Sequence, residues 1–146
     1  MKNSRALITA LALISVAGIS LGGYSYFHRA DSENVYVYNC GIIDFKPTTL
    51  TKYCVDAEVG VADLEWDSWS AKGASGVGKF SVNPCRPTCT DGIWQFANVN
   101  VRLSRSVKEN GKIILSKIEL VTIDKKNLPT ENSPSLEWTL ESTPLD

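Results

Sequence analysis

The strongest pattern in the sequence is an alternation of apolar and polar side chains at residues 96–105. A period of two residues is typical of a strand in an antiparallel sheet with one buried and one solvated face. Asn110-Gly111 follows, and this dipeptide is the strongest short signal for a two-residue hairpin turn. Residues 112–124 form the next apolar stretch. We therefore predict a β-hairpin built from these two stretches.

Shorter strand signals surround this hairpin, and no stretch beyond residue 30 has a helical period. The further predicted strands are residues 35–38, 48–53, 59–66, 80–82 and 136–140. A chain of 146 residues suffices for one domain. The predicted fold class is all-β, a small antiparallel β-sandwich or open barrel after an N-terminal hydrophobic helix. We expect the β domain at 35–128 and an irregular, proline-containing tail at 129–146, with a candidate last strand at 136–140.

The N-terminal segment predicts export. Lys2 and Arg5 precede a run of 18 uncharged residues at 6–23, as in a signal peptide or a membrane anchor. A buried core helix would need a polar stripe that this run lacks. We expect residues 1–28 to be either an uncleaved anchor, which would contact the membrane through residues 6–27, or a cleaved signal peptide. Residues 29–34 would then be a linker. The protein would be a single-pass membrane protein with an extracytoplasmic domain, or secreted.

Four cysteines lie beyond this segment, and an even number outside the cytoplasm is typical of disulfides. Four cysteines allow three connectivities. The short, proline-containing spacing between Cys85 and Cys89 favours local closure, so we predict the pairs Cys40–Cys54 and Cys85–Cys89. A zinc site would need two close pairs, and a redox-active pair usually has two intervening residues rather than three. Neither is predicted, and we expect no metal and no cofactor.

Residues 73–80 resemble a phosphate-binding loop of the form G-x-x-x-x-G-K-[ST]. The last position must supply a hydroxyl to Mg²⁺, and Phe80 has none. Pro84 follows where the required helix would run. We therefore expect no nucleotide partner and interpret the segment as a flexible glycine turn between strands. Beyond residue 30 the chain has 16 acidic and 12 basic residues, which also argues against a nucleic-acid partner.

Asp63, Glu65 and Asp67 alternate, so they would share one face of a strand, at a spacing comparable with that of glycosidase carboxylates. A solvated strand face is the commoner explanation of such a pattern, and we assign no catalytic residue. The only histidine, His28, lies outside the predicted domain, which excludes a Ser-His-Asp triad within the fold. A small carboxylate-dependent hydrolase of cell-wall sugar is kept as an alternative function.

The tryptophans and one loop suggest a binding surface. Trp66 and Trp69 are three residues apart and cannot both face inward on a straight strand, so we expect one at a turn or on the surface. The loop at 84–94 would be clamped by its own disulfide, and a clamped loop loses little entropy when it binds. The residues of the candidate binding surface are Trp69, Arg86, Asp91 and Trp94.

Several motifs occur in an order that resembles a family of small exported disulfide-containing proteins of actinomycete bacteria. These are L-x-W-x-x-W at 64–69 and C-x-P-x-C at 85–89, within about residues 38–122. The chain departs from the family pattern at Ala57-Glu58, Pro84 and Thr90. No activity is established for the family. The resemblance implies export and a disulfide-bearing β domain, and it implies no mechanism.

From these observations we predict an extracytoplasmic binding or interaction module of the bacterial cell envelope. Its partner would be an envelope protein or a glycan. The alternatives are the hydrolase described above and a purely structural envelope protein.

Overall fold

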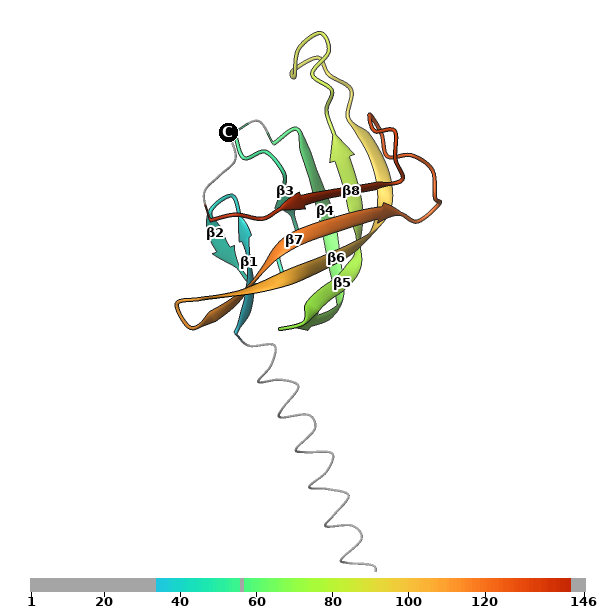
Figure 1. Cartoon of the computed structure of the whole chain (residues 1–146). Coiled ribbons are helices and arrows are strands. Elements are labelled where there is room, and N and C mark those ends of the chain that lie inside the picture. Colours follow the sequence, from blue (N-terminus) through green and yellow to red (C-terminus); the bar gives the residue numbers. More distant parts are fainter. Residues whose placement is uncertain (1–33, 56, 143–146) are drawn as a thin grey trace, which may run out of the picture. The chain divides into compact units, whose positions relative to one another are not determined.

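The computed structural model of the chain describes residues 34–55 and 57–142. These residues form eight strands and no helix (Figure 1). The strands are β1 (Val35–Asn39), β2 (Ile42–Asp44), β3 (Leu50–Thr51), β4 (Val59–Ser70), β5 (Gly73–Val82), β6 (Gln95–Glu109), β7 (Lys112–Thr122) and β8 (Ser135–Thr139). Within the described part of the chain, no helix is long and apolar enough to cross a membrane. The predicted anchor or signal peptide at 1–28 and most of the linker lie outside the described residues.

All eight strands belong to one curled sheet with the order β2-β1-β7-β6-β5-β4-β3. The remaining strand, β8, pairs with residues 117–121 of β7, while β1 pairs with residues 113–115 of the same strand. The all-β prediction is confirmed, and of the two predicted arrangements the sheet is an open half-barrel. It is not purely antiparallel, because β1 and β7 run parallel. All other pairs are antiparallel.

The predicted hairpin is confirmed. β6 and β7 pair antiparallel along most of their length, and the turn between them is Asn110-Gly111. Asn110 has φ 49° and Gly111 has φ 77°. Positive φ at both central residues is what a type I′ turn requires, and its twist matches that of the flanking strands.

The core lies on one face of this sheet. Alternate side chains of β6 and β7 face inward, as the period of two predicts. The core includes Val35, Leu50, Val61, Phe80, Val99, Leu103, Leu115, Ile118 and Leu120. Leu128, Trp138 and Leu140 are also buried in it. The candidate last strand at 136–140 is confirmed as β8, but the segment beyond residue 128 is not an irregular tail, because Trp138 and Leu140 are buried in the core.

The two edges of the curled sheet are tied together. The Trp69 indole nitrogen donates a buried hydrogen bond of 2.9 Å to the Val35 carbonyl. Asn39, at the end of β1, donates through its side-chain amide to the Thr49 carbonyl at 3.0 Å. The Cys40–Cys54 disulfide joins the β1–β2 turn to the segment after β3, with Cα atoms 5.4 Å apart. Closing a loop of this length contributes about 3 kcal/mol through the entropy of the unfolded chain.

The predicted conflict between Trp66 and Trp69 does not arise, because β4 is not straight. Its pairing with β5 shifts between Ala62 and Glu65 and again between Trp66 and Ser68. Each bulge inserts one residue and changes which face the following side chains point to. Both indoles therefore reach the inner face, where their ring centroids lie 4.9 Å apart. Neither sits at a turn.

The segment predicted to be a glycine turn is a central strand. Residues 73–82 form β5, which pairs with β4 on one side and β6 on the other. Gly76 and Gly78 lie opposite the bulges, where the β4 backbone and side chains approach closely. The glycines thus provide room for the bulges of the neighbouring strand rather than freedom for a turn.

Candidate functional site

The loop between β5 and β6, which we call the Cys85 loop (residues 83–94), stands at one end of the sheet (Figure 1). It follows Val82, which pairs with Val59 at the start of β4. Trp69 lies near the other end of β4, where it pairs with Ala74. A strand of this length, 12 residues, spans roughly 35 Å. The predicted binding surface therefore cannot include Trp69, which is 7% exposed and belongs to the core.

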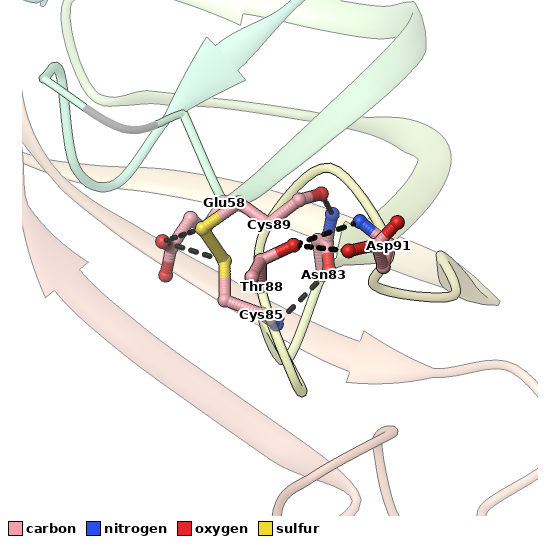
Figure 2. Close-up of a disulfide and its surroundings, with 6 residues drawn as sticks. All are labelled: Glu58, Asn83, Cys85, Thr88, Cys89 and Asp91. Carbon is pink, nitrogen blue, oxygen red and sulfur yellow. Dashed lines mark hydrogen bonds between the residues drawn. A yellow bond between two sulfur atoms is a disulfide. The ribbon is translucent and has the colours of Figure 1, made fainter.

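The predicted disulfide pairing is confirmed, and Cys85–Cys89 closes a short ring within this loop. A buried asparagine holds the same ring from inside (Figure 2). The Asn83 side chain accepts a hydrogen bond of 3.0 Å from the Cys85 backbone N–H and donates one of 2.9 Å to the Cys89 carbonyl. Asn83 is 4% exposed. The backbone at both cysteines is thus fixed by hydrogen bonds as well as by the disulfide.

The tip of the loop has its own hydrogen bonds. The Thr88 hydroxyl donates to the Asp91 carboxylate at 2.7 Å, and the Asp91 backbone N–H donates back to the Thr88 hydroxyl at 3.2 Å. Both side chains are exposed, as is that of Arg86. Asp91 is therefore partly engaged in shaping the loop, and Arg86 offers its charge to solvent.

Glu58 approaches the disulfide from the start of β4. Its Oε1 atom lies 2.7 Å from Cys85 Sγ and 3.0 Å from Cys89 Sγ (Figure 2). The three ligand-type atoms of Glu58, Cys85 and Cys89 all lie within 4.8 Å of one another. The sequence analysis did not connect Glu58 with the cysteines, because Glu58 lies 27 residues before Cys85. It comes next to the loop through the pairing of β4 with β5.

Four exposed apolar side chains accompany the loop at this end of the sheet. We call them the apolar rim: Ile93, Trp94, Phe96 and Ile123, which are 79%, 46%, 58% and 52% exposed. Phe96 and Ile123 line one cavity of about 470 Å³. Ile93, Phe96 and Ile123 were not predicted. Phe96 has a sequence signal, since it stands on the otherwise polar face of the alternating stretch.

A second cavity of about 550 Å³ adjoins the loop. It is lined by Glu58, Val59, Val82, Asn83, Pro84, Arg86, Gln95 and Thr130. Its lining residue Gln95 neighbours Phe96 in sequence, and Thr130 neighbours Pro129 of the first cavity. The surface therefore continues from the disulfide across β6 to the segment between β7 and β8.

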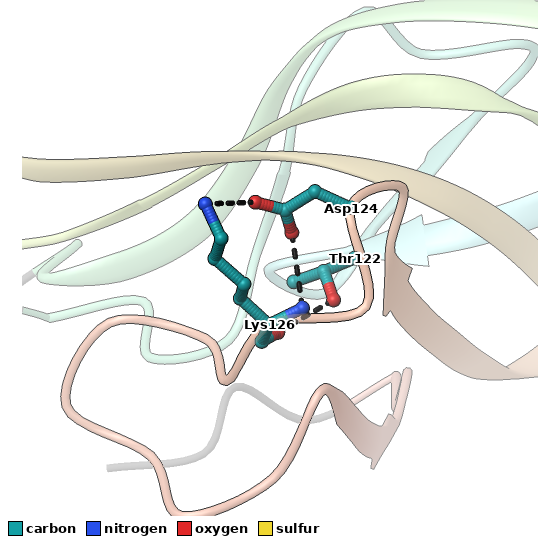
Figure 3. A network of polar contacts seen from close by, with 3 residues as sticks. All are labelled: Thr122, Asp124 and Lys126. Atoms are coloured by element: carbon teal, nitrogen blue, oxygen red, sulfur yellow. Dashed lines mark hydrogen bonds and ion pairs between the residues drawn. The ribbon is translucent and has the colours of Figure 1, made fainter.

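The β7–β8 segment is held by a small polar network (Figure 3). The Thr122 hydroxyl donates to the Lys126 carbonyl at 2.6 Å. The Asp124 carboxylate accepts the Lys126 backbone N–H at 3.1 Å and pairs with the Lys126 ammonium at 3.4 Å. The backbone hydrogen bond is the main cause of a lowered pKa of the Asp124 carboxyl.

This lowered pKa predicts a specific response to acid. Because the folded-state pKa of Asp124 is depressed, its contribution is present above the ordinary value of 3.8 and is lost as the pH falls through the folded pKa. In an NMR titration, the change in the Lys126 amide shift should have its midpoint below pH 3.8. Asp124→Asn should abolish that step. A midpoint above 3.8 in the wild type would contradict the assignment.

The three alternating carboxylates do not form one row. Asp63 has φ 51° at the first bulge of β4 and forms an exposed ion pair with Lys79, with an N–O distance of 3.2 Å. Asp67 stands at the second bulge. It lines a separate cavity of about 350 Å³ together with Glu119 and Arg102. All three carboxylates are exposed, as a solvated strand face predicts, but the two bulges interrupt the even spacing between them.

Two disulfides and no free cysteine in the described residues indicate an oxidising, extracytoplasmic environment. The arrangement at the Cys85 loop combines an apolar rim, one free cationic side chain and a fixed backbone, which are features of recognition surfaces. No protein-family model, no curated protein and no solved structure matches this chain.

Proposed function

We propose that this protein is a binding module of the bacterial cell envelope, and that it binds an envelope protein through the Cys85 loop and the apolar rim. The observation that carries the proposal is the gathering of four exposed apolar side chains beside a loop fixed by a disulfide and by Asn83. Apolar side chains grouped on a surface are typical of interaction sites rather than of solvated faces.

The composition of the rim favours a protein partner over a glycan. Tryptophan and arginine are the residues most enriched at energetic hot spots of protein interfaces, and Trp94 and Arg86 provide one of each. Ile93 adds aliphatic area beside Trp94, and Ile123 lines a cavity together with Phe96. The loop is fixed before binding, so less conformational entropy is lost on association.

The position of the loop also suits recognition. The first described strand begins at Val35, which contacts Trp69 near the β4–β5 turn. The Cys85 loop follows the opposite end of β4. In a protein held by the predicted N-terminal anchor, the loop would be separated from the start of the domain by the length of β4. A partner could then reach the loop without displacing the strand that follows the linker.

Photo-crosslinking in cells tests the proposal. A crosslinking residue placed at position 94 should give a covalent adduct with one envelope protein. The matched control is position 107, because Val107 is 47% exposed and lies near the β6–β7 turn at the other end of the molecule. The control should give no such adduct. Equal amounts of adduct at both positions, or no adduct at either, would contradict the proposal. An adduct with a glycan would show that the partner is a glycan rather than a protein.

Substitutions should then weaken binding without unfolding the domain. With the crosslinked partner purified, we expect Trp94→Ala to raise the Kd at least about tenfold, as removal of a hot-spot side chain does. Arg86→Ala should also raise it. The melting temperature should stay nearly unchanged, because exposed substitutions usually alter stability by about 0.5 kcal/mol or less. Val107→Ala is the control for both measurements, and an unchanged Kd in Trp94→Ala would contradict the assignment of the surface.

A second candidate function is hydrolysis of a cell-wall sugar. The observation in its favour is that Asp67 and Glu119 line the same cavity. Two carboxylates in one cleft are the minimum that glycoside hydrolysis requires. Asp67→Asn and Glu119→Gln would each abolish release of sugar fragments from purified cell wall if this were the activity. Absence of any release by the wild type excludes it.

A further inference from the structure

We propose that Glu58, Cys85 and Cys89 form a redox-gated site for a thiophilic divalent cation such as Zn²⁺. In the disulfide form the site is closed, because the two sulfurs are bonded to each other. In the dithiol form it offers two sulfur ligands and one carboxylate oxygen. This inference does not depend on the proposed partner or on the apolar rim.

The position of Glu58 is the first observation. Its Oε1 atom lies 2.7 Å and 3.0 Å from the two sulfurs, so the carboxylate is in direct contact with both of them. A disulfide sulfur has no hydrogen to donate, whereas a thiol is a donor and a thiolate binds metals. The carboxylate is therefore placed where it would contact both thiols, or a cation held between them. A purely structural bridge requires no such group.

The Asn83 side chain is the second observation. It holds the Cys85 N–H and the Cys89 carbonyl through two hydrogen bonds that do not involve sulfur. The Cα atoms of the two cysteines are 3.8 Å apart. Gly92 packs against the Asn83 side chain and leaves no room for a Cβ atom there. Because neither hydrogen bond involves a sulfur atom, we expect both to persist after reduction and to keep the two thiols close together when the bridge is opened.

The site opens by reduction of the Cys85–Cys89 disulfide and is then filled by the cation. A dithiol reductant transfers two electrons and two protons to the bridge and leaves as its own disulfide, which frees Cys85 and Cys89 as thiols. Binding of Zn²⁺ then releases two thiol protons to solvent. At Zn–S distances of about 2.3 Å and tetrahedral angles, the sulfurs would be about 3.8 Å apart. A carboxylate oxygen is an accepted third ligand of Zn²⁺.

Three protein ligands leave one position of a tetrahedral cation open. Cys89 is exposed, whereas Glu58 and Cys85 are only partly exposed, so a cation could enter from the loop side. The open position would be taken by water or by a group on another molecule. Such a site differs from a closed structural zinc centre, which has four protein ligands.

The test is a cation titration of the full chain in both redox states. The protein is reduced with a water-soluble phosphine, which does not offer competing thiols, and is titrated with Cd²⁺ as a Zn²⁺ analogue. We expect one Cd²⁺ per reduced chain, with the ultraviolet absorption of a cadmium–thiolate bond. The oxidised chain should bind none. Equal binding by the two redox states would overturn the proposal.

Substitutions locate the cation. Glu58→Gln should weaken binding at least about tenfold, because it replaces a charged ligand by a neutral amide of the same shape. The matched control is Glu65→Gln, an exposed glutamate of β4, the strand that begins directly after Glu58, and it should bind like the wild type. Cys85→Ser with Cys89→Ser should abolish binding although Cys40 and Cys54 remain. Unchanged binding in Glu58→Gln, or persistent binding in the double variant, would overturn the assignment.

A measurement of folding separates loss of the site from loss of the structure. Because Asn83 holds the loop, the Cys85→Ser, Cys89→Ser double variant should keep the far-ultraviolet circular dichroism of the wild type. The folded double variant should nevertheless bind no Cd²⁺. If opening the ring disorders the domain in this variant and in the reduced wild type, the two ligands are not held in place and the proposal fails.

Discussion

Trp69→Ala should lower the free energy of unfolding by about 3–5 kcal/mol, the range for removal of a large aromatic side chain from a core. Trp69 is buried, packs edge-to-face on Trp66, and lies 5.9 Å from Phe45 between ring centroids. Its indole also donates to the Val35 carbonyl and so ties β4 to β1 across the open side of the half-barrel. The substitution therefore removes both the packing of the indole in the core and the hydrogen bond that joins β4 to β1.

Urea unfolding followed by circular dichroism measures this effect, and two variants sharpen it. Trp69→Phe keeps a ring but leaves the Val35 carbonyl without its donor, which should cost about 1–3 kcal/mol. Trp94→Ala removes an equal side chain from the surface and should cost about 0.5 kcal/mol or less. Similar losses in Trp69→Ala and Trp94→Ala would contradict the described difference in burial.

Gly76→Ala should destabilise the domain by about 4 kcal/mol, at the upper end of what overpacking causes. A Cβ atom at this position would collide with the Glu65 carbonyl and would lie 3.1 Å from the Trp66 Cα atom. Both neighbours are backbone atoms of β4, so relief requires the two strands to separate at the second bulge. The melting temperature should fall accordingly.

Gly78→Ala is the matched control, since it adds the same methyl group two residues along the same strand. Its Cβ would meet mainly the Val61 Cγ2 atom at 2.8 Å and the Leu64 Cδ2 atom at 3.0 Å. These are ends of side chains that can rotate, so we expect a loss of about 1–2 kcal/mol. If Gly78→Ala is as damaging as Gly76→Ala, the collision with the β4 backbone at Gly76 is not the cause.

Local patterns predicted much of this fold. The alternation in residues 96–105 and the Asn110-Gly111 turn depend on side chains close in sequence, so β6, β7 and their hairpin could be recognised. The disulfide pairing followed from short spacings and is confirmed. Each of these features is decided within about fifteen residues of chain.

Features that depend on distant contacts were not predictable. The parallel pairing of β1 with β7 joins segments from opposite ends of the domain. The glycines of β5 resembled a turn, because their reason lies in the bulges of the neighbouring strand. The two indoles of β4 share a face for the same reason. A bulge shifts the alternation of inward and outward side chains, and the sequence of a single strand has no periodic pattern that predicts where this shift occurs.

The residues of the candidate site also separate into those that local sequence predicts and those that depend on contacts between distant segments. Arg86, Asp91 and Trp94 lie on one exposed loop, as predicted, because the loop and its cysteines are contiguous in sequence. Trp69 was grouped with them wrongly, since nothing in the sequence shows that β4 carries it to the far end of the sheet. Glu58 and Ile123 reach the loop through strand pairing, so they could only be found once the sheet order was known.

The parallel pairing of β1 with β7 also determines when the domain can fold. Because synthesis proceeds from the N-terminus, β1, Cys40 and Cys54 are made long before residues 113–115. The Cys40–Cys54 bridge can therefore form while β1 still has no neighbour on that side. Folding rates fall as contacting residues become more distant in sequence. Until residues 113–115 have been made, β1 can pair only with β2 among the described strands.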